Sequence, residues 1–266
     1  MQLNKQILIG YLILNLIVIL FLSFPHFNAY LSNLNLNKQI ENGHSKIVVI
    51  RADDFYEITP GWEWLTDLTK SKDFGATYAA IPYWLNQTTV TALKQLMDEN
   101  KIEIATHGFK KLAGLSYQDQ YNIINQSTNI LTKDFYRPRT FVPPNGADDQ
   151  NTLDACNALE YHVVSGDYVS GVQSITEFVP DFEWESNWTD PKNVPHVSFS
   201  NFKFAFDKFD KSSAKAFIIV LHPNEYEDKN GTLKTGEANA FEQSIDYMKG
   251  KNVEFMTMDQ LYRWNK

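Results

Sequence analysis

The stretch KIVVIRADD, residues 46–54, decides the fold class, because its apolar run is too short for a helix and ends in two adjacent carboxylates. Six further apolar runs of similar length follow it, at residues 75–81, 102–105, 140–142, 162–165, 216–221 and 253–256. Helical patterns such as those at residues 88–100, 116–135 and 237–250 lie between them. Alternating strands and helices predict parallel pairing with right-handed crossovers. We therefore expect an α/β fold, a distorted (β/α)7 barrel.

An open doubly wound sheet is the alternative architecture for this pattern. A dinucleotide-binding sheet of that kind carries a glycine-rich loop after its first strand, and no such loop follows any of the apolar runs. In both architectures the functional side chains gather at the carboxyl ends of the strands. We therefore look for the site at one rim of the sheet.

Polar, aromatic and turn-forming residues follow six of the predicted strands. In chain order they are Asp53 and Asp54; Pro82, Tyr83 and Trp84; Thr106 and His107; Pro143, Pro144, Asn145 and Gly146; Gly166 and Asp167; and His222. Two adjacent carboxylates allow one to bind a cation while the other accepts a proton from water. An isolated Asp-Asp pair is more often a turn or a helix cap. The coincidence of these residues at one rim is what favours a functional site.

The composition fits a folded domain and excludes one class of partner. The chain has 266 residues, of which 43% are hydrophobic and 14% aromatic, so it can fill a sizeable core and general disorder is excluded. Its formal net charge of -8 and pI of about 5.3 argue against nucleic-acid binding, which requires a basic surface.

The amino-terminal segment predicts a membrane anchor. Residues 7–24 are uncharged and apolar, which is just long enough to span a bilayer. Lys5 precedes this run, so its cationic flank should stay in the cytoplasm and the rest should lie outside. A cleaved signal peptide, giving a secreted protein, is the alternative. We expect a cytoplasmic tip and anchor or signal at residues 1–27, a stalk at 28–45 and the barrel domain at 46–266.

Four short motifs in the soluble part resemble those of a known family. They are IRADD (50–54), IEIATHGF (102–109), FVPPNG (141–146) and IIVLHP (218–223). Their order and spacing resemble the polysaccharide deacetylases of the NodB-homology type, also called carbohydrate esterase family 4. The similarity covers about residues 46–264, which is most of the soluble part.

The resemblance implies a role for each matching residue. Asp53 would be the catalytic base and His222 the general acid, while Asp54 and His107 would hold a divalent metal, with zinc the expected ion. The implied substrate-binding residues are Tyr83, Trp84, Pro143, Pro144, Asn145 and Leu221. The implied activity is metal-dependent removal of N-acetyl groups from an extracellular or cell-surface polysaccharide, so the expected partner is an N-acetylated glycan.

Two positions depart from the family pattern. A second histidine is expected four residues after the first metal-binding histidine, and this chain has Lys111 there; an arginine is expected before the two prolines, and this chain has Val142. Zinc in catalytic sites takes three protein ligands. Asp148 or His196 could complete the site, or Lys111 could itself stabilise an oxyanion without metal. Arg139 could reach the base in place of the missing arginine.

A non-catalytic domain is the competing interpretation. A catalytically impaired NodB-like domain would keep a glycan groove in which Trp84, Trp184 and Trp188 stack on sugar rings. The interval from Tyr168 to Ser200 would form an insertion at the rim, serving as a lid or wall. A glycoside hydrolase is a third class, which needs two carboxyl groups about 5–10 Å apart across a groove. Nothing in the spacing of the carboxylates demands it.

Overall fold

The computed structural model describes residues 46–99, 102–167, 175–184 and 198–266. The predicted anchor and stalk lie outside the described residues, and so do His196 and Trp188. Among the helices described, none is long and apolar enough to cross a membrane.

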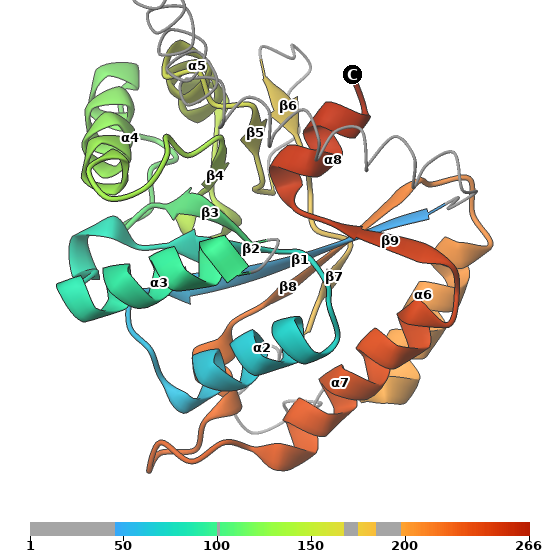
Figure 1. The fold of residues 1–266 in the computed structure, drawn as a ribbon. Helices are drawn as coiled ribbons and strands as arrows, with labels where there is room; N and C mark the ends of the chain where they lie inside the picture. The colour runs from blue at the N-terminus through green and yellow to red at the C-terminus, as the bar shows by residue number, and fades with distance from the viewer. Residues whose placement is uncertain (1–45, 100–101, 168–174, 185–197) are drawn as a thin grey trace, which may run out of the picture. The chain divides into compact units, whose positions relative to one another are not determined.

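A parallel sheet forms the centre of the domain (Figure 1). Its described strands are β1 (Lys46–Phe55), β2 (Ala76–Ala80), β3 (Ile102–His107), β4 (Thr140–Val142), β5 (Val163–Val164), β6 (Thr176–Glu177), β7 (Phe182–Glu183), β8 (Ala216–Leu221) and β9 (Val253–Met256). They are ordered β6-β5-β4-β3-β2-β1-β8-β7, and β9 pairs with the first half of β1. Every strand pair is parallel, so the predicted α/β class is confirmed.

Helices connect the strands and cover the outer face of the sheet (Figure 1). The α-helices are α2 (Pro60–Ser71), α3 (Gln87–Glu99), α4 (Tyr117–Thr132), α5 (Gln150–Ala158), α6 (Phe199–Asp210), α7 (Thr235–Lys249) and α8 (Met258–Trp264). Short 3-10 turns follow three strands, at η1 (Pro82–Trp84), η2 (Pro144–Gly146) and η3 (Pro223–Tyr226). The helices predicted at residues 88–100, 116–135 and 237–250 are confirmed as α3, α4 and α7.

The alternation of side chains along β1 defines an outer and an inner face of the sheet. Val48, Ile50 and Ala52 belong to the large core that β1 shares with the helices. Because successive strand residues point to opposite faces, Arg51 and Asp53 face the inside of the sheet. The interior therefore holds polar side chains at this strand, while the apolar residues pack outward.

The strand count differs from the seven that we predicted. Nine strands are described, and the two additional ones, β6 and β7, fall within the interval predicted as a rim insertion. β6 and β7 form the two ends of the strand order and do not pair with each other, so the described strands form a half-barrel that is not closed. Strands of two residues are too short to show any periodicity, which is why the sequence did not reveal them.

Trp184 corrects one sugar-stacking hypothesis. It directly follows β7, is only 4% exposed, and packs against Phe202 and Phe241. Its backbone NH donates to the carbonyl oxygen of Val220 on β8, which draws the side chain into the core. Trp184 is therefore a core residue and is not available to stack on a sugar ring.

Candidate active site

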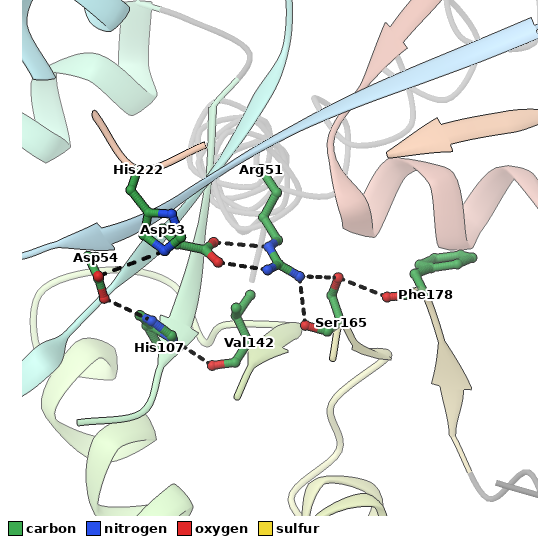
Figure 2. A network of polar contacts seen from close by, with 8 residues as sticks. All are labelled: Arg51, Asp53, Asp54, His107, Val142, Ser165, Phe178 and His222. Carbon is green, nitrogen blue, oxygen red and sulfur yellow. Dashed lines mark hydrogen bonds and ion pairs between the residues drawn. The ribbon is translucent and has the colours of Figure 1, made fainter. Parts of the chain in front are cut away.

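Arg51 and Asp53 form a buried ion pair on the inner face of β1 (Figure 2). The Nε atom of Arg51 lies 3.0 Å from Oδ1 of Asp53, and Nη2 lies 2.7 Å from Oδ2. The relative exposures of the two side chains are 5% and 4%. This two-pronged geometry is the strongest that arginine makes with a carboxylate, because both donors bind at once. The Asp53 carboxylate is therefore held in one orientation.

Asp54 breaks the regular alternation of β1. Its φ of 63° lies in the left-handed region, and the pairing with β2 shifts register between Ala52 and Phe55. The side-chain amide of Asn224 donates to the backbone carbonyl of Asp54 at 3.2 Å, which ties this residue to the turn after β8. The Asp54 carboxylate consequently reaches across to β3, where its Oδ1 lies 3.0 Å from Nε2 of His107.

His107 is oriented by a backbone contact on its other ring nitrogen. Nδ1 lies 2.7 Å from the carbonyl oxygen of Val142 on β4 (Figure 2). A carbonyl can only accept, so Nδ1 carries the proton and Nε2 faces Asp54 either with a second proton or with its lone pair. Burial acts to raise the pKa of Asp54, but the hydrogen bond with His107 and the charges of His107 and His222 together lower that pKa below its ordinary value.

His222 follows the carboxyl end of β8 and completes the group. Its Nε2 lies 3.9 Å from Oδ2 of Asp54, and its side chain is 20% exposed. The following turn packs closely on α2: a Cβ added to Gly61 would lie 1.9 Å from the carbonyl oxygen of Pro223. The structure thus brings Asp54, His107 and His222 together, with the Asp53–Arg51 pair beside them (Figure 2).

Asp54 and His107 have the chemistry of metal ligands. A metal-binding histidine almost always donates its second ring NH to a carbonyl or carboxylate, as His107 does to Val142. When Nδ1 carries the only ring proton, Nε2 and the Asp54 carboxylate are both hydrogen-bond acceptors, 3.0 Å apart. A cation bound between them would offset their mutual repulsion. The two residues therefore fit a divalent ion. No set of three His, Cys, Asp or Glu side chains that could hold a metal occurs in the part of the chain that the structure describes.

The predicted substrate-binding residues lie on the loops that follow the strands. η1 places Trp84 with 57% exposure, edge-on to Tyr56 at 5.4 Å between ring centroids. Tyr83 meets Phe109, from the loop after β3, at 4.4 Å between ring centroids. The four rings thus form two pairs on the loops that follow the strands.

The remaining predicted substrate-binding residues differ in burial. Leu221 and Pro143 are buried, Pro144 is partly buried and Asn145 is exposed. Asn145 has a φ of 57° within η2, a left-handed conformation that asparagine adopts more readily than most residues.

Of the four proposed replacement residues, Arg139, Lys111 and Asp148 are described by the structure, and His196 lies outside the described residues. The Nη1 atom of Arg139 donates to the carbonyl oxygen of Glu160 at 2.9 Å, so the structure directs Arg139 away from Asp53. Lys111 is exposed on the loop after β3, outside the Asp54 contacts described above. Asp148 is buried against Gly166, where an added Cβ would lie 2.5 Å from its Oδ1.

Arg51 is the site residue that sequence reasoning missed. It sits two residues before Asp53, and residues at this spacing share one face of a strand. That signal is present in IRADD, whereas our expectation fell on Arg139, which precedes the motif from which the arginine is absent.

Part of the chain is similar in sequence to a known protein family, and its fold is similar to several solved structures. Residues 41–164 match the family model for polysaccharide deacetylase. No curated protein matches the chain by sequence. Among solved structures, a family 4 acetyl xylan esterase from Clostridium thermocellum, in complex with a cobalt ion, is 17% identical, with a TM-score of 0.58 over 82% of this chain and 91% of that one.

Two other solved structures share the fold. A protein from Mycobacterium smegmatis that is assigned to the polysaccharide deacetylases has a TM-score of 0.64 at 13% identity, over 84% of this chain and 91% of its own. A family 4 pseudoenzyme from Bacillus anthracis has a TM-score of 0.59 at 13% identity, over 82% of this chain and 66% of its own. Residues 41–164 therefore match the polysaccharide deacetylase family, and the described domain has a NodB-like fold, like that of carbohydrate esterase family 4.

Proposed function

We propose that this domain is a metal-dependent hydrolase that removes N-acetyl groups from an extracellular or cell-surface polysaccharide. The observation that carries the proposal is the contact of 3.0 Å between Asp54 and His107, next to an orientated Asp53 carboxylate. A ligand pair, a base and a second histidine at one rim are the parts that amide hydrolysis requires.

In the proposed reaction Asp53 accepts a proton from the attacking water. The oxygen of that water bonds to the acetamide carbonyl carbon, and the carbon–nitrogen bond then breaks. His222 gives its proton to the leaving nitrogen, so that acetate and a free amino sugar result. Asp54 and His107 would hold the divalent ion, whose Lewis acidity polarises the carbonyl and favours ionisation of water.

The loops around the site suit a sugar substrate. In the proposal the exposed face of Trp84 stacks on a pyranose ring, and Tyr83 supports it from the same turn. Leu221 and Pro143 supply apolar surface for the acetyl methyl group, while Pro144 and Asn145 border the groove. The uncharged run at residues 7–24 would place this domain outside the cytoplasm, either anchored in the membrane or secreted after cleavage.

Acetate release from N-acetylated oligosaccharides, measured with added zinc or cobalt, tests the proposal. We expect Asp53→Asn to lower the rate at least about 100-fold, because the base is lost. Asp67→Asn, an exposed position on α2, is the matched control and should leave the rate unchanged. If the wild type releases no acetate, or if wild type and Asp53→Asn release it at equal rates, the proposed activity is wrong.

A catalytically impaired glycan-binding domain is the second candidate. The observation that favours it is the presence of only two metal-binding side chains, Asp54 and His107, among the described residues of the site. Lys111 stands where the family pattern has a further histidine.

Lys111→His distinguishes the two candidates. If the wild-type site is impaired, the substitution should raise metal content towards one ion per chain and create acetate release, because it adds a third ligand. If the wild type already binds one ion and releases acetate, the enzyme is supported. Lys110→His, which alters the exposed neighbour, is the control and should have neither effect.

A further inference from the structure

We propose that Arg51 is the positioning residue of the site, which fixes the carboxylate of Asp53 from the same strand. This inference rests on the proposed function, since it assigns Asp53 as the base. It replaces the expectation that an arginine from the loop before the two prolines would make this contact.

The contact between the two residues leaves little freedom. Arg51 meets both carboxylate oxygens of Asp53, at 3.0 Å and 2.7 Å, and neither side chain is more than 5% exposed. Rotation of the carboxylate would break both hydrogen bonds inside the sheet, where water cannot replace them. The direction in which Asp53 presents its remaining lone pairs is thus set by Arg51.

The guanidinium is itself held from the opposite side (Figure 2). Its Nη1 atom donates at 2.8 Å to both the carbonyl oxygen and the hydroxyl of Ser165, just after β5. The Ser165 hydroxyl in turn donates to the carbonyl oxygen of Phe178 at 2.9 Å. The chain Asp53–Arg51–Ser165–Phe178 therefore runs across the interior from β1 to the segment after β6, so that the position of the base depends on both sides of the sheet.

The interior has room for this long side chain because its neighbours are small. Ala79, Ala105 and Val142 form a separate buried cluster that does not include the residues packed against the helices. They lie on β2, β3 and the end of β4, and by alternation they share the inner face with Arg51. Two alanines and a valine leave space that larger residues would fill. The small side chain of Val142 and the long side chain of Arg51 are thus complementary: the guanidinium that contacts Asp53 comes from β1, and the position before the two prolines is apolar.

A purely structural ion pair is the competing explanation for the Arg51 contact. Buried ion pairs are weak contributors to stability, because desolvation of both charges offsets their attraction. A pair kept only for stability has no need of a rim location next to Asp54 and His107. The distinction between the two roles lies in which kinetic constant responds when Arg51 is removed.

The test is a double-mutant cycle on the purified full-length chain, with Arg51→Met, Asp53→Asn and the combined variant. We expect Arg51→Met to lower kcat about 100-fold while KM changes less than about twofold, since an orienting contact acts on the transition state. The combined variant should be no slower than Asp53→Asn alone, because Arg51 acts through Asp53. Ser165→Ala, which removes one of the two contacts to Nη1, should lower kcat by a smaller factor. Arg263→Met is the matched control, because it also removes an arginine from an aspartate but lies on α8, where the arginine side chain is exposed.

Losses in kcat that multiply in the combined variant would overturn the positioning role. Thermal unfolding of the same variants provides a readout that needs no activity. Arg51→Met should unfold at a lower temperature than the combined variant, since it alone leaves a buried carboxylate without its partner. If the wild type releases no acetate, the proposed function fails, and the unfolding midpoints still decide the coupling. If the shifts of the two single variants add up to the shift of the combined variant, Arg51 and Asp53 are not energetically coupled and the proposal is wrong.

Discussion

Near the carboxyl ends of the strands Asp54 and His107 lie 3.0 Å apart, and near the amino ends of β3 and β5 Asp259 and His162 lie 2.6 Å apart. Both are aspartate–histidine pairs, yet their surroundings differ. Asp259 is also bound by Arg263, at 2.9 Å and 2.6 Å, and the ring of His162 stacks on Tyr262 at 4.6 Å. The pair at the amino ends is therefore saturated by neighbours that hold it in place.

The pair at the carboxyl ends is left open to the outside. The Asp54 side chain is 40% exposed, against 16% for Asp259, and its two histidine contacts are at 3.0 Å and 3.9 Å. Because both pairs consist of an aspartate and a histidine, the residue types alone do not distinguish a structural pair from a functional one. What distinguishes them is whether other side chains complete the carboxylate or leave it accessible to a ligand.

Exchanging one histidine at each end gives the largest expected difference. We expect His107→Gln to lower acetate release at least about 100-fold, because the proposed metal loses one of its two protein ligands. His162→Gln should change the rate less than about twofold, since its ring contacts Asp259 and Tyr262 near the amino ends of the strands. The measurement is the initial rate at saturating metal. Equal losses in the two variants would contradict the division between the ends.

The pH dependence of stability sharpens the same comparison through Glu103, a buried residue near the amino-end pair. Burial, with the added negative charge of Asp259, raises the pKa of Glu103. Glu103 therefore contributes stability that is fully present below its unfolded value of 4.5 and is lost as pH rises through the folded-state pKa. Glu103→Gln cannot ionise, so its unfolding temperature should rise relative to that of the wild type between about pH 5 and about pH 8.

Glu63→Gln, at an exposed position on α2, is the control for this experiment and should follow the wild type at both pH values. If the difference in unfolding temperature between the wild type and Glu103→Gln does not change with pH, Glu103 does not ionise in this range.

The smallest expected effect concerns the helix that carries Asp259. Thr257 caps α8: its hydroxyl accepts from the backbone NH of Gln260, whose side chain accepts from the NH of Thr257. Thr257→Ala should reduce the free energy of unfolding by about 1 kcal/mol, a shift of roughly 2–4 °C, and leave acetate release unchanged. Thr88→Ala, an exposed position inside α3, is the control for thermal melts. Loss of activity in Thr257→Ala would mean that the two ends are coupled.

Much of the fold and several residues of the candidate site were predictable from the sequence. The strands at residues 46–51 and 216–221 are apolar because they are buried in a parallel sheet, and their ends carry Asp53, Asp54 and His222. Strand ends are readable because composition changes abruptly where the chain leaves the core.

The interior contacts were harder to predict. Arg51 lies within an apolar strand and resembles a residue at a solvated edge, while its partner Ser165, which itself contacts Phe178, is 114 positions away. Trp184 was misplaced because the strand before it has only two residues and belongs to the sheet through β8. Both failures concern contacts between distant segments, which no local periodicity records.

The left-handed backbone at Asp54 restricts which residues can occupy that position. Asparagine adopts a φ near 63° readily, whereas alanine does so at a cost and β-branched residues scarcely at all. Asp54→Asn would thus remove the carboxylate charge and keep the bend of β1, while Asp54→Val would also force the chain back towards regular strand geometry. Substitutions at Asp54 should therefore fall into two groups. Those that keep the left-handed backbone lose only the carboxylate ligand, whereas β-branched residues also disturb the path of the main chain and should have the more severe effect.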